Sequence, residues 1–290
     1  MDPGIVFCPN VECPARGQAG QGHIRIHSRQ DTRFLCTACR QTFAATQGTA
    51  VYRLRTSATT VTLGVTLLAH GCPWQAIVVA FGCDERTGAS WAARAGSQGQ
   101  AVQAHVVEQP RELGQVQAAE IRVKPQGGMV GMALAIMVRT RLWLAGEVSV
   151  HRDLPLMRRL MERVRRGAAP RPLVFCTDGF VAYGGAIRET CRDPQRTGGP
   201  GRPRRRPWKH LLIAQVVKRS AQRRVVAVEP RIIAGTAARV ATLLRRSPGE
   251  GVRNTSAIAR LNATFRERLA VLTRRRRALA RRPLPLEHKM

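Results

Sequence analysis

Helical spacing of apolar residues dominates one early part of the chain, from residue 57 to about 96. Ser57 suits a helix N-cap, and Pro73 suits the start of a second helix. Gly71 and Gly82 interrupt the pattern where short turns would fall. The pattern therefore predicts three consecutive helices joined by glycine-containing turns, the third of which runs through Trp91.

Farther along, short apolar runs predict a sheet. Three runs predict strands that we expect to be antiparallel, and a helical segment and a buried strand follow them. Two further strands and a final helix complete the pattern. In chain order, these expected elements cover 116–123, 128–138, 142–150, 153–166, 173–178, 210–217, 224–233 and 254–272. This order predicts a domain in which helices pack on a mixed sheet.

The strand predicted over 173–178 ends in a carboxylate, Asp178, and a glycine follows it. A carboxylate at the tip of a buried strand suits a hard divalent cation, because such ions prefer oxygen ligands. Alternatively, Asp178 could simply cap the turn or the next helix. The strand by itself leaves both interpretations open.

Composition indicates the kind of partner. The chain carries 48 Lys and Arg against 18 Asp and Glu, which gives a net charge of +30. An excess of this size predicts a polyanionic partner, most simply nucleic acid, over the alternative that basic residues only solvate the surface. Residues 192–210 are rich in glycine, proline and arginine, so we expect a flexible loop that contacts phosphate. Its candidate DNA contacts are Arg202, Arg204, Arg205 and Arg206.

The cysteines predict a metal site. The sequence has no apolar run near 18 residues and no signal-peptide pattern, so we expect no membrane contact and a reducing compartment. Cys8 and Cys13 form one pair and Cys36 and Cys39 another, with the strand-like segment 23–27 between them. Two thiolate pairs on two turns can close a tetrahedral zinc site of the ribbon type. The alternatives are a redox pair or coincidence.

The predicted helices could read DNA. The second and third predicted helices, joined by a short turn, resemble a helix-turn-helix. The third helix would then enter the major groove. That helix would present Arg86, Thr87, Ser90 and Arg94. Gly88 counts against this interpretation, since glycine inside a helix costs about 1 kcal/mol relative to alanine. A three-helix spacer with a polar face is the alternative. Residues 44–56 and 97–114 are expected to be linkers.

Several of these motifs together resemble insertion-sequence transposases of the IS-one-like type. The resemblance lies in the two cysteine motifs at 8–17 and 36–39, Gly48-Thr49-x-x-Tyr52, Asp84 to Trp91, Gln117 to Lys124, Thr177-Asp178-Gly179 and Asn254 to Asn262. It implies a ribonuclease-H-like catalytic domain of the DDE type. In that family three acidic residues hold two Mg²⁺ or Mn²⁺ ions for DNA cleavage and strand transfer.

Carried onto this sequence, the second acid is Asp178, whereas the first and third positions are Ala119 and Ala259. Glu120 adjoins the first position, but side chains alternate along a strand, so we expect it to face away from Asp178. Glu267 lies roughly 12 Å along the helix from Ala259, too far to substitute. The resemblance therefore implies a degenerate copy that keeps DNA binding and lacks phosphoryl transfer.

The expected fold is a multidomain α+β or α/β protein. Its expected parts are a zinc ribbon over 1–52, a helix-turn-helix domain over 57–97, a ribonuclease-H-like mixed sheet with helices over 115–272, and a basic tail over 273–290. The expected partner is double-stranded DNA at the element's terminal inverted repeats, in the cytoplasm of a prokaryote at the nucleoid. The sequence leaves the oligomeric state open, and a homo-oligomer is one of the alternatives. The alternatives are a non-enzymatic zinc-ribbon and helix-turn-helix regulator, or an RNA-binding protein.

Overall fold

The computed structural model describes residues 2–107, 109–123, 130–195, 203–222, 224–247, 253–269 and 272. The chain packs as two compact units. One comprises Met1–Leu68 and Cys72–Gln98, and the other comprises Ala69–Gly71 and Gly99–Met290.

The first unit begins with a small sheet. A 3-10 turn, η1 (Pro3–Ile5), precedes three antiparallel strands, β1 (Ile24–Ser28), β2 (Arg33–Cys36) and β3 (Thr42–Ala44), in the order β1-β2-β3. Its hydrophobic core is small: Phe34 and Phe43 pack at 5.9 Å between ring centroids, beside the cysteines. So small a core supplies little folding energy by itself.

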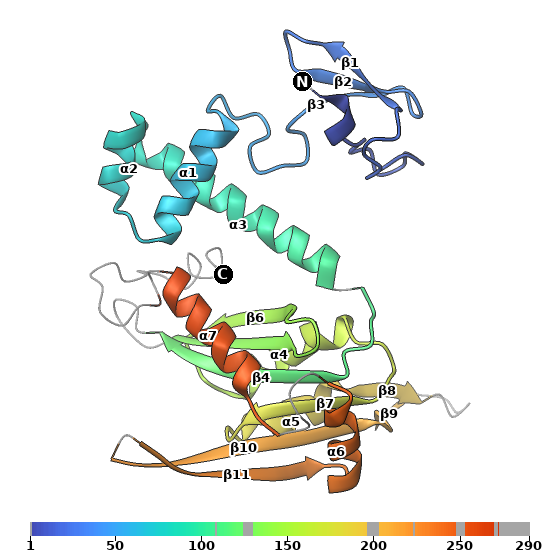
Figure 1. Cartoon of the computed structure of the whole chain (residues 1–290), viewed down its shortest axis with the longest axis vertical. Coiled ribbons are helices and arrows are strands. Elements are labelled where there is room, and N and C mark those ends of the chain that lie inside the picture. Colours follow the sequence, from blue (N-terminus) through green and yellow to red (C-terminus); the bar gives the residue numbers. More distant parts are fainter. Residues whose placement is uncertain are drawn as a thin grey trace. The chain divides into compact units, whose positions relative to one another are not determined.

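Three helices complete this unit, as the sequence predicts (Figure 1). They are α1 (Ala58–Ala69), α2 (Trp74–Phe81) and α3 (Glu85–Val107). Gly82 turns the chain between α2 and α3 with a φ of 61°, a conformation that favours glycine. Trp91 is buried and meets the ring of Phe81 edge to face.

The expected linker over 97–114 is wrong in its first half, because α3 continues to Val107. Val107 is buried against the core of the second unit, to which this end of the helix belongs. The amide of Gln103 also donates to the carbonyl of Trp143 at 2.7 Å. These long-range contacts stabilise helix over a segment whose own sequence is polar and contains glycine.

The second unit contains a six-stranded mixed sheet. Its strands are β4 (Gln115–Val123), β5 (Val130–Met137), β6 (Trp143–Ser149), β7 (Leu173–Asp178), β10 (Leu211–Ala221) and β11 (Arg224–Ala234), in the order β11-β10-β7-β4-β5-β6. The first three are antiparallel, as expected. The central strand β7 runs parallel to both β4 and β10, and β11 returns antiparallel to β10.

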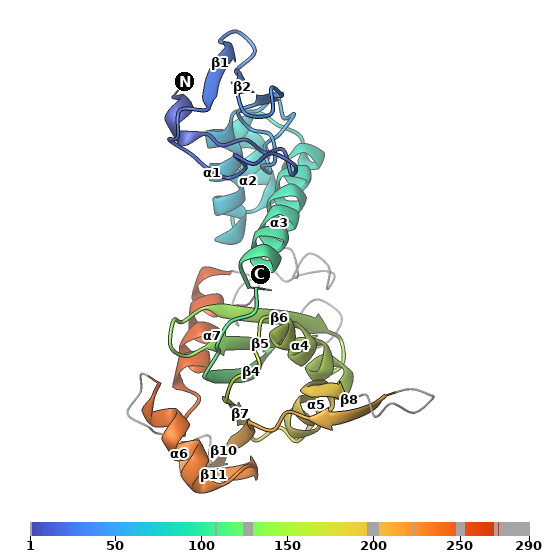
Figure 2. The same ribbon diagram turned by 90° about the vertical axis from the view of Figure 1, so that its right-hand side faces the viewer.

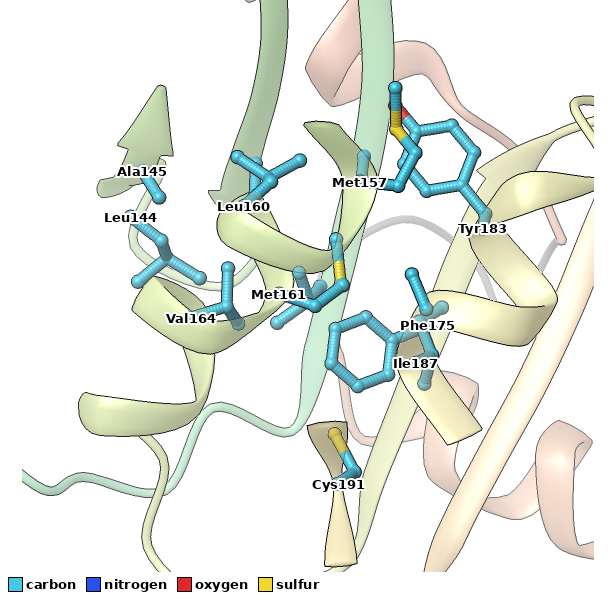
Figure 3. Packing of buried hydrophobic residues seen from close by; sticks show 14 of the residues in the cluster. Leu144, Ala145, Met157, Leu160, Met161, Val164, Phe175, Tyr183, Ile187 and Cys191 are labelled. Carbon is cyan, nitrogen blue, oxygen red and sulfur yellow. The ribbon is translucent and has the colours of Figure 1, made fainter. Parts of the chain in front are cut away.

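Helices cover both faces of this sheet (Figure 2). The helices α4 (Leu154–Arg166) and α5 (Ala182–Thr190) lie on one face, and α6 (Ala237–Arg245) and α7 (Ser256–Arg268) lie on the other. Asp153 caps α4 by accepting a hydrogen bond from the backbone of Leu156. Figure 3 shows the largest core cluster, in which α4 side chains such as Met161 pack toward Phe175 of β7 and Ile187 of α5.

Three short elements differ from the sequence predictions. The helices α5 and α6 occur where the sequence predicted no helix. The expected flexible loop over 192–210 instead contains a hairpin, β8 (Arg192–Gln195) and β9 (Arg204–Pro207). Asp193 lies opposite Arg206 in this hairpin and pairs with Arg165 of α4 at 3.1 Å, so the segment carries opposite charges side by side.

The protein is thus a mixed α/β structure whose large sheet is compatible with a ribonuclease-H-like fold. In the part of the chain that the structure describes, no helix is both long and apolar enough to cross a membrane.

Candidate functional site

The four cysteines near the N-terminus converge on one point. The sulfur atoms of Cys8 and Cys39 lie 3.7 Å apart, as do those of Cys13 and Cys36, and all four sulfurs lie within 4.8 Å of one another. Zinc binds thiolate sulfur at about 2.3 Å in a tetrahedron, which places neighbouring sulfurs about 3.8 Å apart. This group could therefore hold a metal ion such as zinc.

The pKa values of three of these thiols are shifted. Burial raises the pKa of Cys8 to about 12, and it also raises the pKa of Cys13. A backbone hydrogen bond at Gln41 lowers the pKa of Cys39 to about 7. Thiolates are the metal-binding form, and a bound cation offsets the burial that disfavours them. The donor set suits a thiophilic cation, which would draw the cluster together.

A second candidate site lies at the C-terminal end of β7, in a cavity of about 560 Å³. Ala119 of β4, Asp178 of β7 and Ala259 of α7 all line this cavity. Arg152, Lys218 and Asn262 lie around it. Three positions that are far apart in the sequence thus meet at one end of the sheet, where ligands commonly bind in open sheets with parallel strands.

Strand register and helix anchoring bring these positions together. Ala118 of β4 pairs with Thr177 of β7 in parallel register, so the next residues, Ala119 and Asp178, emerge side by side. Gln117 holds α7 against this face of β4: its Oε1 accepts a hydrogen bond from the backbone of Ile258 at 3.0 Å. Its Nε2 donates to Asn254 Oδ1, also at 3.0 Å.

Asp178 has an unusual protonation equilibrium. Burial is the main cause that raises its pKa from 3.8 to about 7, and the negative charge of Glu120 is the next. The backbone N–H of Phe180 opposes this shift by donating to Asp178 Oδ1 at 3.1 Å. Near neutral pH the carboxyl is therefore protonated in a substantial fraction of molecules.

The influence of Glu120 corrects the expectation that it lies away from Asp178. Alternation does turn Glu120 to the face of α4 and α5. There its negative charge is, after burial, the next cause that raises the pKa of Tyr183. However, β7 ends at Asp178, so no further backbone separates the two carboxyl groups. At the end of the strand, side chains from opposite faces can approach each other.

Arg152 neutralises Glu120. Its Nε donates to Glu120 Oε1 at 2.6 Å, its Nη2 also contacts that oxygen, and its guanidinium lies 3.8 Å from the ring centre of Phe180. The Glu120 side chain is only 5% exposed, and within the described residues its Oε2 has no hydrogen-bond partner. Glu120 is therefore held in an ion pair through Oε1 alone.

The other residues predicted to contact DNA lie in two places. On α3, Arg86 and Ser90 are exposed and Thr87 is half-buried, while Arg94 donates to the carbonyl of Tyr52 at 2.9 Å. In β9, Arg204, Arg205 and Arg206 are all exposed. Arg202 and the basic tail over 273–290 fall outside the described residues.

Arg152, Lys218, Gln117 and Asn262 were missed by the sequence analysis. Gln117 and Asn262 lie in the segments 117–124 and 254–262 that carry the family resemblance, but the resemblance gave them no role. Arg152 and Lys218 belong to none of those segments. Within the described residues, the cysteine cluster is the only group of three or more His, Cys, Asp or Glu side chains that could hold a metal. The pocket itself offers one acidic side chain, Asp178.

No protein-family model matches the chain, and no curated protein matches it either.

Proposed function

We propose that this chain is a transposase-derived protein of an insertion sequence that binds double-stranded DNA but lacks a complete phosphoryl-transfer site. The observation that carries the proposal is the meeting of Ala119, Asp178 and Ala259 in one cavity. The motif resemblance assigns these three positions to the acidic residues of the catalytic site, and they come from three separate elements. Accidental motif matches would not be expected to converge in this way.

The missing chemistry follows from the two alanines. Two-metal phosphoryl transfer requires several carboxylate oxygens to fix two divalent ions about 3.5–4 Å apart. Alanine provides no ligand oxygen, and Asp178 alone cannot fix two ions. Glu120 does not replace the missing ligand, because it does not line the cavity and its Oε1 is held by Arg152. Catalysis in this copy is consequently proposed to be absent, whereas the fold that positions the site is kept.

The first unit and the charge support DNA as the partner. A cysteine cluster that suits structural zinc precedes three helices joined by short turns, an order compatible with a helix-turn-helix. Arg86 and Ser90 are exposed near the start of α3, where such proteins contact base edges. The net charge of +30 suits the phosphate backbone. The proposed target is duplex DNA at the ends of the element, and the proposed location is the prokaryotic nucleoid.

Fluorescence anisotropy with a labelled duplex, measured with the zinc-loaded chain and without added Mg²⁺ or Mn²⁺, tests this function. We expect the affinity to fall by at least about a hundredfold between about 50 and 200 mM salt, because each phosphate contact releases counterions. Arg86→Gln should weaken binding more than Arg171→Gln, which removes the same charge from an exposed site outside the three helices. Affinity that is independent of salt, or equal effects of the two variants, would contradict the proposal.

A further inference from the structure

The cavity around Asp178 has the charge of an anion site. Its charged lining residues are Arg152, Lys218 and Asp178, and the other residues that line it are neutral. Two cations and one carboxyl group therefore line the cavity, while Glu120, which does not line it, pairs with Arg152. Carboxylates at positions 119 and 259 would reverse this balance, but both residues are alanine.

We propose that this cavity binds a phosphate group directly, without a divalent cation, and that the natural ligand is a phosphodiester of bound nucleic acid. The choice of a phosphodiester rests on the proposed function, whereas the choice of phosphate rests on the residues of the cavity. In this account a pocket that resembles a metal-dependent catalytic site serves as an additional contact to the nucleic acid backbone.

Arg152 is already oriented for such a ligand. Its Nε and Nη2 are held by Glu120, and its plane is packed on Phe180. Neither contact uses Nη1, and the residue lines the cavity. A guanidinium fixed in this way loses little side-chain entropy when it binds, and its planar donors match the geometry of a phosphate.

Thr255 and Asn262 add neutral donors. Both are only 7% exposed, and both line the cavity. The hydroxyl of Thr255 does not cap α7, although Thr255 is the N-cap residue, so it can donate to a ligand. Within the described residues Asn262 Oδ1 is buried without a hydrogen-bond partner. Because amide oxygen and nitrogen can exchange places, Asn262 can turn its NH₂ group toward an anion.

The helix α5 adds a weaker electrostatic contribution. It starts after Val181, which also lines the cavity, and no side chain caps its first turn. The unbonded N–H groups at a helix N-terminus favour a negative charge nearby. A divalent cation, in contrast, would meet Arg152, Lys218 and this helix end with only Asp178 to bind it.

Isothermal titration calorimetry of the full zinc-loaded chain with inorganic phosphate, without added Mg²⁺ or Mn²⁺ and at constant ionic strength, tests the site. Lys218→Gln removes a cation that lines the cavity, and Lys209→Gln removes one from another exposed position in the same unit. We expect phosphate to bind about tenfold more weakly to Lys218→Gln and with unchanged affinity to Lys209→Gln. Equal affinities for the two variants, or binding only when Mg²⁺ is added, would overturn the proposal.

A second arm identifies the source of the phosphate. The same two variants, zinc-loaded, are titrated with a labelled DNA duplex without added Mg²⁺ or Mn²⁺, and Lys218→Gln should again bind more weakly. If the variants differ for inorganic phosphate but not for the duplex, the assignment of the ligand as a phosphodiester is wrong. The phosphate arm contains no nucleic acid, so its result separates failure of this site from failure of the proposed DNA binding.

Discussion

Gln117 and Ile258 are joined by a hydrogen bond of 3.0 Å between the Gln117 side-chain oxygen and the Ile258 backbone N–H. Gln117 is buried in β4, two residues before Ala119 and on the same face of the strand. Ile258 lies in the first turn of α7, next to Ala259. This one contact therefore fixes the distance between two walls of the cavity that holds Asp178.

Gln117→Met should loosen α7. Methionine has a similar volume, but it leaves the Ile258 N–H and Asn254 Oδ1 without the hydrogen bonds that Gln117 supplies. We expect a loss of about 1–3 kcal/mol in the free energy of unfolding and faster amide exchange over 256–268. Hydrogen-exchange mass spectrometry measures both. Unchanged exchange in α7 would show that apolar packing alone positions the helix.

The stability of the chain should fall as pH rises because of Asp178. Its folded pKa of about 7 exceeds the ordinary 3.8, so the folded state holds a proton that the unfolded state has already released. The stabilisation is complete below about pH 4 and is lost as pH rises through about 7. Between pH 5 and 8 this group should account for about 2 kcal/mol in urea denaturation.

Asp178→Asn should remove that part of the pH dependence, because asparagine mimics the protonated acid. Glu112→Gln, at an exposed position of the same unit, is the matched control and should keep the slope of the unchanged chain. A slope that persists in Asp178→Asn would mean that another group is responsible.

Gly88→Ala should destabilise the first unit, against the usual preference of helices for alanine. A Cβ at this position would lie 2.4 Å from Trp74 Cζ3, so the tryptophan ring would have to move. Gly99 lies in the same helix with open space around its Cα, so Gly99→Ala should instead stabilise by about 0.5–1 kcal/mol. Thermal denaturation compares them, and equal shifts of the same sign would contradict the packing at Trp74.

Removal of metal should unfold the small sheet alone. Its core is too small to fold unaided, and structural zinc typically contributes about 10–16 kcal/mol of apparent binding energy. We expect a strong chelator, or Cys36→Ser, to abolish amide protection over 24–44 and to leave α4 protected. Cys176→Ser, at a buried cysteine outside the cluster, is the control. Retained protection of the sheet after complete loss of metal would argue against a metal-dependent fold.

The order of the elements and the cysteine cluster could be predicted because their signals are local. The spacing of Cys8, Cys13, Cys36 and Cys39 predicts two pairs on two turns, and in the structure the four sulfur atoms lie together. Short apolar runs similarly predicted the strands of the large sheet. Gly88 looked unfavourable for a helix, yet the ring of Trp74 occupies the space that a side chain would need.

Features that depend on distant contacts could not be predicted in this way. The helix α5 contains Gly184 and Gly185, which weaken any helical pattern. The hairpin of β8 and β9 contacts a distant part of the chain, since Asp193 pairs with Arg165 of α4. The approach of Glu120 to Asp178 depends on where β7 ends. Each result comes from the tertiary arrangement rather than from neighbouring residues.

The central claim is that Ala119 and Ala259 occupy the positions of two missing metal ligands beside Asp178. The most direct measurement is Mn²⁺-dependent nicking of supercoiled DNA by the chain and by its Ala119→Asp, Ala259→Glu double variant. The account predicts nicking by the double variant alone, and no nicking by the double variant when Asp178→Asn is added. Nicking by the unmodified chain would contradict the account, because Asp178 would then have other ligands beside it.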